Sequence, residues 1–254
     1  MKVILLGTGT SQGVPVIACE CPTCKSDDPR NTRTRASALI SYNGRNIVLD
    51  TATEFRLQMV ANDIKHLDAV LFTHAHADHV HGLDDIRQFN KIQQAVIPCY
   101  ANAETLESIG RKYDYVFKPT QEGGGKPDIT LNEVSGDFDL FGRTIVPLAV
   151  KHGILDILGF RAGKFAYITD ASNVPDETLE RLCGLEVFVI NALRYIPHET
   201  HFSVGQAIDV IREVQPKISY LTHLSHIIEH ERLESELPEN IHVAYDGLTI
   251  EIPD

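Results

Sequence analysis

The sequence lacks three things: long hydrophobic runs, an excess of basic residues and an even set of cysteines. Its apolar runs, such as 3–6 and 187–190, fall far short of the roughly 18–20 residues of a membrane-spanning helix, which excludes a membrane span. The apolar stretch after Met1 is too short for a signal peptide, so we expect a cytoplasmic protein. With 43% hydrophobic residues and no dominant polar tract, the chain is not disordered.

Basic residues are scarce. The 23 Lys and Arg are outnumbered by 35 Asp and Glu, which gives a formal net charge of −12. Such a balance disfavours broad nucleic-acid binding, because that binding depends on a basic surface. It leaves room for a small phosphodiester substrate held by metal ions. We therefore expect a small-molecule partner and no membrane or nucleic-acid partner, with a homodimer as an open alternative to a monomer.

The five cysteines are unevenly placed. Cys19, Cys21 and Cys24 fall within six residues, whereas Cys99 and Cys183 stand alone in apolar surroundings. An odd number of cysteines without an export signal indicates thiols or thiolate ligands rather than disulfides. We expect Cys99 and Cys183 to lie in the core.

The order of apolar patterns predicts an α/β fold in a single domain over residues 1–254. Short β-rich runs alternate with helical patterns at 80–89 and 204–214, and the runs occupy 3–6, 46–49, 69–72, 144–150, 165–168, 187–190 and 218–221. A loop is expected over 120–136, which contains three consecutive glycines.

Five of these strands end in a possible metal ligand or a residue that supports one: Asp50, His74, His152, Asp170 and His223. Side chains at one edge of a sheet converge in space, as they do in active sites built on strand ends. Asp50 either orients a ligand histidine or caps the turn that follows its strand.

The densest cluster is His74-Ala75-His76-Ala77-Asp78-His79, with four metal-binding side chains in six residues. His74 and His76, two residues apart at a strand end, point to the same side. Asp78 and His79 lie where the chain turns into a helix, so they can face a neighbouring position. The alternative is a solvated polar loop, a description that suits His81 better.

This segment resembles the H-x-H-x-D-H signature of the metallo-β-lactamase superfamily, and His152, Asp170 and His223 follow in the order of that family. The resemblance implies an αββα sandwich, in which two mixed β-sheets carry helices on both outer faces. It also implies two active-site ions, Zn²⁺, Mn²⁺ or Fe²⁺. One ion takes His74, His76 and His152. The other takes Asp78, His79 and His223, and Asp170 bridges the two.

The cysteine loop supplies three thiolates, and tetrahedral Zn²⁺ needs a fourth ligand. His226, three residues beyond His223, is the best candidate, although free thiols or a redox pair are the alternative. The cysteines, the segment 7–15 and the terminal segment 222–226 together resemble the PhnP-like cyclic-phosphate phosphodiesterases of the superfamily, which carry a structural Cys₃His zinc site.

That resemblance implies hydrolysis of a small, cyclic phosphodiester, such as a ribosyl 1,2-cyclic phosphate, or of a nucleotide. A hydroxide held by the two ions would attack phosphorus, with Asp78 among the catalytic ligands and His201 as general acid. His198 competes with His201 for that role or touches substrate. Arg33 and Arg35 are candidates to grip a phosphate, although a solvated basic turn is the plainer interpretation.

Three alternatives to this function stay open. A tRNA 3′-processing endonuclease would need a long arm that grips tRNA, and the chain offers only the short segment 120–136. A thioester hydrolase of the glyoxalase type would need an added helical region at the C-terminus. A non-catalytic accessory protein like PqqB would use the Cys₃His site for shape alone, and the intact dinuclear ligand set argues against it.

Overall fold

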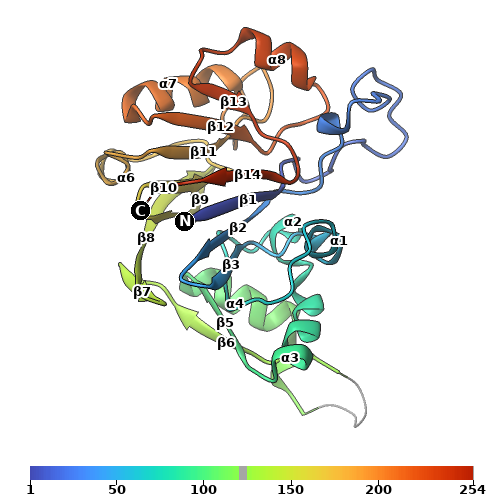
Figure 1. The fold of residues 1–254 in the computed structure, drawn as a ribbon, viewed down its shortest axis with the longest axis vertical. Coiled ribbons are helices and arrows are strands. Elements are labelled where there is room, and N and C mark those ends of the chain that lie inside the picture. The colour runs from blue at the N-terminus through green and yellow to red at the C-terminus, as the bar shows by residue number, and fades with distance from the viewer. Residues whose placement is uncertain (120–124, 254) are drawn as a thin grey trace.

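The chain folds into two seven-stranded mixed β-sheets packed face to face, with helices on both outer faces (Figure 1). The computed structural model describes residues 1–119 and 125–253. This is the αββα sandwich that the superfamily resemblance predicts. The two chain ends meet, because the Met1 amino group donates a hydrogen bond to the Ile252 carbonyl over 2.8 Å.

The first sheet has the order β14-β1-β2-β3-β4-β5-β6. Its strands are β1 (Lys2–Gly7), β2 (Ser37–Tyr42), β3 (Arg45–Leu49), β4 (Ala69–Leu71), β5 (Ile97–Ala101), β6 (Ile129–Glu133) and β14 (Leu248–Glu251). The strands from β3 to β6 run parallel, so their carboxyl ends share one edge of the sheet.

The second sheet has the order β13-β12-β11-β10-β9-β8-β7. Its strands are β7 (Phe138–Leu140), β8 (Arg143–His152), β9 (Leu155–Ala162), β10 (Phe165–Ile168), β11 (Val187–Asn191), β12 (Ile218–Thr222) and β13 (Ile241–Val243). Here the strands from β10 to β13 are the parallel ones.

The helices connect these strands and cover the sheets. They are η1 (Pro29–Asn31), α1 (Phe55–Ala61), α2 (Ala77–Val80), η2 (Leu83–Ile86), α3 (Arg87–Gln93), α4 (Ala103–Lys112), α5 (Asp114–Phe117), α6 (Asp176–Arg181), α7 (Val204–Val214) and α8 (His230–Glu236). Among the described residues, no helix is long and apolar enough to cross a membrane.

Alternation along the strands divides the core into layers. In β10 and β11, Tyr167 and Val189 point between the sheets, whereas Ile168 and Ile190 point outward against α6, α7 and α8. Successive side chains of a strand face opposite sides, so one apolar run supplies two layers. The same division in the first sheet buries Val48 under the helices on the opposite face.

Three expectations about local structure need correction. The expected loop over 120–136 contains β6, because Ile129 to Glu133 pairs in parallel with β5 at the sheet edge, and residues 120–124 lie outside the described residues. The helix expected over 80–89 is interrupted at Gly82, where a Cβ atom would lie 2.2 Å from the Ala52 carbonyl oxygen. Cys99 is buried as expected, but Cys183 is exposed at the turn after α6.

A candidate dinuclear metal site

Three histidines form one cluster at the open edge of the sandwich. His74 and His76 come from the loop after β4, and His152 ends β8. His74 Nε2 lies 3.0 Å from His76 Nδ1, and one ring nitrogen from each of the three residues falls within 4.8 Å of the others. Three imidazoles at this spacing form a donor set that fits a divalent cation.

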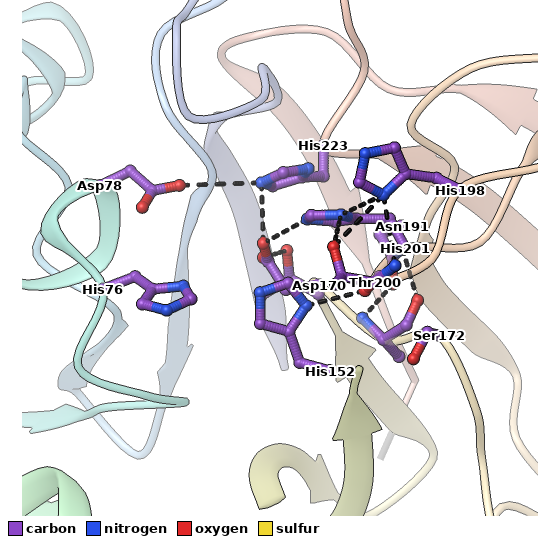
Figure 2. A network of polar contacts seen from close by, with 12 residues as sticks. His76, Asp78, His152, Asp170, Ser172, Asn191, His198, Thr200, His201 and His223 are labelled. Atoms are coloured by element: carbon purple, nitrogen blue, oxygen red, sulfur yellow. Dashed lines mark hydrogen bonds and ion pairs between the residues drawn. The ribbon is translucent and has the colours of Figure 1, made fainter. Parts of the chain in front are cut away.

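A second cluster lies beside the first and combines Asp78, His79, Asp170 and His223. His79 Nε2 lies 3.2 Å from one oxygen of Asp78 and 3.2 Å from Asp170 Oδ2. His223 Nε2 lies 3.0 Å from Asp170 Oδ1 (Figure 2). Because Asp170 also lies within 4.8 Å of the His152 donor atom, its carboxylate stands between the two clusters.

The backbone turns sharply at three residues that follow strands at this edge, two of them in the clusters and one behind them. Asp50, Asp170 and His223 adopt left-handed φ values of 62°, 58° and 57° just after β3, β10 and β12. Non-glycine residues rarely adopt this conformation, and such strain concentrates at functional sites. Asn191 at the end of β11 braces the turn at Asp170, since its side chain accepts from the Ala171 amide and donates to the Ala171 carbonyl.

In two of the ligand histidines, a partner behind the ring orients the second ring nitrogen. His79 Nδ1 lies 2.7 Å from Asp50 Oδ2, and Asp50 also accepts hydrogen bonds from the Thr73 amide and hydroxyl. His152 Nδ1 lies 2.7 Å from the Thr200 carbonyl oxygen. In both residues Nε2 is therefore left facing the clusters, which is the usual arrangement of metal-binding histidines. Of the two expected roles of Asp50, orienting a histidine is the one seen, because the other contacts of its carboxylate are to Thr73 after β4 and not to the turn after β3.

The buried carboxylates of the clusters favour positive charge beside them. Burial disfavours the charged form of His223, but the adjacent Asp170 carboxylate raises the pKa of this histidine to about 9. Burial likewise opposes the charge of Asp170, whose pKa is nevertheless held well below its usual range by His223 and His79. The buried Nε2 atoms of His79 and His223 lie beside the carboxylate oxygens of Asp78 and Asp170 without the alignment of a hydrogen bond, and His223 Nδ1 has no hydrogen-bond partner among the described residues. A bound cation would accept the lone pairs of deprotonated ring nitrogens here and would balance the charge of the buried carboxylates.

A separate cluster joins the two ends of the sequence. The His226 Nδ1 atom lies 3.2, 3.5 and 3.7 Å from the sulfurs of Cys19, Cys21 and Cys24. A tetrahedral zinc ion with Zn–S near 2.3 Å and Zn–N near 2.0 Å separates its sulfur and nitrogen ligands by about 3.5 Å. The Cys₃His geometry therefore fits a closed structural zinc site, with His226 in the position expected of the fourth ligand.

His201 reaches into the dinuclear site from the loop before α7. Its Nε2 lies 3.0 Å from Asp170 Oδ1, and its Nδ1 lies 2.9 Å from the Thr200 hydroxyl. Its ring stacks on His223 with centroids 5.0 Å apart. His198 lies one layer farther out, with its Nδ1 atom 3.5 Å from His201 Nδ1 (Figure 2). Of the two competitors, His201 is the one in contact with the cluster.

The expected phosphate contact of Arg33 is wrong. Its side chain is 1% exposed, and its guanidinium donates hydrogen bonds to the carbonyls of Ser225 and Ile228 and to Asn31 Oδ1. The backbone bridge between Val14 and Arg33 carries this side chain inward, so it supports the loop that bears His226. Arg35 forms an ion pair with Glu54 and donates to the Ser11 carbonyl.

Two supporting residues escaped the sequence analysis. Thr200 contacts His152 through its main-chain carbonyl, and the residue type gives no indication of a main-chain acceptor. Thr73 places its hydroxyl 2.7 Å from Asp50 and 3.0 Å from His74 Nδ1. Its position directly before His74, at the end of an apolar run, was the available signal.

The comparisons with known proteins agree with this geometry. Residues 45–224 match the family described as the beta-lactamase superfamily domain. A crystal structure described as a new diphosphatase from the PhnP family is 37% identical, covers 99% of this chain and 98% of its own, and superposes with a TM-score of 0.93. The chain belongs to the PhnP family of the metallo-β-lactamase superfamily. The superfamily fold implies divalent metal binding. Two of the three segments that resemble PhnP-like enzymes, the cysteine loop and residues 222–226, carry residues of the candidate metal sites.

Two further relatives place this PhnP-family chain among its neighbours. A protein of Porphyromonas gingivalis named octanoyltransferase is 41% identical over 98% of this chain, which spans about half (51%) of that relative's length. Zinc-bound PqqB from Methylobacterium extorquens covers 99% of this chain and 100% of its own, with a TM-score of 0.81. At 20% identity, the PqqB likeness shows the fold alone.

Proposed function

We propose that the protein is a metal-dependent phosphodiesterase that hydrolyses a small, cyclic phosphodiester such as a ribosyl 1,2-cyclic phosphate, or a nucleotide. The observation that carries the proposal is the juxtaposition of a three-histidine cluster and an Asp₂His₂ cluster around Asp170. Two divalent ions would be held there, one by His74, His76 and His152 and the other by Asp78, His79 and His223, with Asp170 between them. When bound, such ions supply charge neutralisation at phosphoryl oxygens and an activated water.

The chain itself would contribute the proton that the leaving oxygen needs. His201 suits this role because it lies at the edge of the cluster, held by the Thr200 hydroxyl on one side and Asp170 on the other. Burial lowers the pKa of His201, and the adjacent Asp170 carboxylate opposes this shift. A protonated His201 could give its proton to the more basic leaving alkoxide and take another from water. The contact with Asp170 holds the Nε2 atom of His201 at the edge of the cluster, where the proton would be needed.

A second candidate is hydrolysis of a diphosphate bond, which the PhnP-family diphosphatase relative favours. Both reactions break a P–O bond, and the esterified phosphorus of a diphosphate carries two bridging oxygens like that of a phosphodiester, so one site could serve either. The octanoyltransferase name belongs to a protein about twice as long, and it makes an octanoyl thioester a necessary comparison substrate.

The test combines metal analysis with a substrate panel on one sample. We expect about three metal ions per chain. We also expect turnover of bis(p-nitrophenyl) phosphate and little turnover of p-nitrophenyl phosphate or octanoyl-coenzyme A. His74→Ala should abolish the activity, and His81→Ala, at an exposed histidine of the next turn, should retain it. A fully metallated protein inert on every diester and diphosphate would overturn the proposal and favour the thioesterase or the accessory role.

A further inference from the structure

The Gly-Thr-Gly-Thr segment at residues 7–10 binds the backbone directly after His223 and supplies none of the proposed metal ligands. The Thr8 carbonyl accepts a hydrogen bond from the Leu224 amide over 2.9 Å, and the Thr10 amide donates to the Leu224 carbonyl over 3.1 Å. His223 itself has a left-handed backbone, which residues other than glycine rarely adopt. The segment therefore holds the turn from which His223 reaches the metal clusters.

A glycine lets the same segment lie against a second stretch of backbone. Gly9 forms parallel backbone bridges with both Arg35 and Leu224. A Cβ atom at Gly9 would lie 2.8 Å from the Arg33 carbonyl oxygen, so a larger residue would push the two backbones apart. The segment is thus the middle one of three adjacent pieces of backbone, and a shift of the segment would move the turn at Leu224.

One carboxylate joins two of these pieces. Asp246 Oδ1 accepts hydrogen bonds from the Thr8 amide and hydroxyl over 2.9 and 2.8 Å. Its Oδ2 accepts from the Thr34 amide and hydroxyl, both over 2.7 Å. An ionised carboxylate carries acceptors only, so it matches these four donors. Burial raises the pKa of Asp246 to about 6, against the effect of these hydrogen bonds, so the carboxylate is ionised above that pH.

The first sheet fixes Asp246 in turn. Gly247 follows it with a left-handed φ of 86°, and the Gly247 amide donates to the Leu5 carbonyl over 2.7 Å. Leu5 in β1 also pairs with Leu248 at the start of β14. The carboxylate therefore stands at the end of a paired strand, and it can hold Thr8 and Thr34 in a fixed position relative to the sheet.

We propose that Asp246 is a positioning residue for His223, and that it acts through the backbones of Thr8 and Leu224. The inference rests on the proposed function only in taking His223 as a metal ligand, and it does not depend on the substrate. It predicts a selective effect: without the Asp246 carboxylate, the ion that binds His223 is held more weakly. The ion of the three-histidine cluster and the ion of the cysteine cluster keep their affinity.

The test replaces Asp246 by Asn, which keeps the shape of the side chain but has a single acceptor oxygen. The NH₂ group of Asp246→Asn would face the amide of Thr8 or of Thr34, and a backbone N–H cannot accept a hydrogen bond. At pH 8 in chelator-buffered zinc, we expect the affinity for one ion to fall about tenfold. Anomalous diffraction at the zinc edge, on crystals grown at limiting zinc, shows which ion is lost. At saturating zinc, hydrogen exchange at the Leu224 amide should become about tenfold faster.

Asp68→Asn is the matched control, because Asp68 also accepts from a backbone amide, that of Asn46 over 2.7 Å, at the end of β3 away from the site. Thr8→Val and Thr8→Ser form a milder pair that decides the question if Asp246→Asn does not fold. Thr8→Val removes one donor and should show the same selective loss in part, and Thr8→Ser should retain the affinity of the wild type.

Equal weakening of all the ions, or of none, would show that Asp246 only stabilises the fold. The positioning role would then be overturned, while the proposed function would stand. Conversely, a wild-type protein that binds its ions but cleaves no diester or diphosphate would overturn the proposed function, and a selective loss in Asp246→Asn would still support the positioning of His223.

Discussion

The Nδ1 atom of His79 lies 2.7 Å from Oδ2 of Asp50, and both side chains are fully buried. Asp50 adopts a left-handed backbone conformation just after β3, and His79 lies in α2, so the pair ties the sheet edge to the metal-binding loop. The carboxylate fixes which imidazole nitrogen carries the proton and leaves Nε2 facing Asp78 and Asp170.

Asp50→Asn should therefore weaken metal binding without removing a ligand. An amide of the same shape is a poorer partner for the His79 N–H, and loss of such a partner costs about 10–100-fold in metal affinity or activity. The measurement is zinc occupancy in chelator-buffered solutions. Asp63→Asn, at an exposed loop position, is the control. Unchanged occupancy in Asp50→Asn would show that the pair only holds the fold together.

His201→Ala should separate catalysis from metal binding. Loss of a general acid lowers turnover by about 10²–10⁴-fold. The metal content should stay at the wild-type level, because the two clusters keep all seven of their proposed ligands. Turnover of bis(p-nitrophenyl) phosphate and metal content are measured on the same preparation, with His81→Ala as the exposed-histidine control. Loss of a metal ion would instead make His201 a ligand, and an unchanged rate would remove it from the mechanism.

Much of the site could be predicted because its side chains follow directly after apolar strands. Asp50, Asp170 and His223 each stand within two residues of a strand end, where a short apolar run in the sequence stops and the chain turns. The three cysteines could be interpreted because thiolates at such short spacing have few other uses. Each of these features can be recognised from a short stretch of sequence. That the distant stretches form one site follows from the order in which the family places its ligands along the chain.

Other features depend on packing that no local pattern encodes. Arg33 looks like part of a basic surface turn, yet its backbone pairs with Val14 and places the guanidinium beneath the Ser225 to Ile228 loop. The Thr200 carbonyl is a main-chain group, so its role toward His152 leaves no mark on the residue type.

The Cys₃His cluster should support stability rather than turnover. Cys21→Ser should remove one zinc ion per chain and lower the free energy of unfolding by at least about 4 kcal/mol, because loss of a structural metal ranks among the most destabilising changes. Thermal unfolding and metal analysis measure the two effects. Cys183→Ser changes an exposed thiol outside the cluster and should alter neither. If Cys21→Ser kept its zinc and its melting temperature, the cluster would be a set of free thiols.

Replacing Arg33 should show whether its guanidinium stabilises the fold or binds substrate. Arg33→Met would leave the Ser225 and Ile228 carbonyls and Asn31 Oδ1 without their donor in a buried position. We expect a loss of stability of about 3–5 kcal/mol, at roughly 2–4 °C of melting temperature per kcal/mol, with KM unchanged for the folded fraction. Arg35→Met removes an ion pair with Glu54 whose side chains are 26% and 20% exposed, and it should cost about 1 kcal/mol or less. A raised KM in Arg33→Met at wild-type stability would return Arg33 to the substrate site.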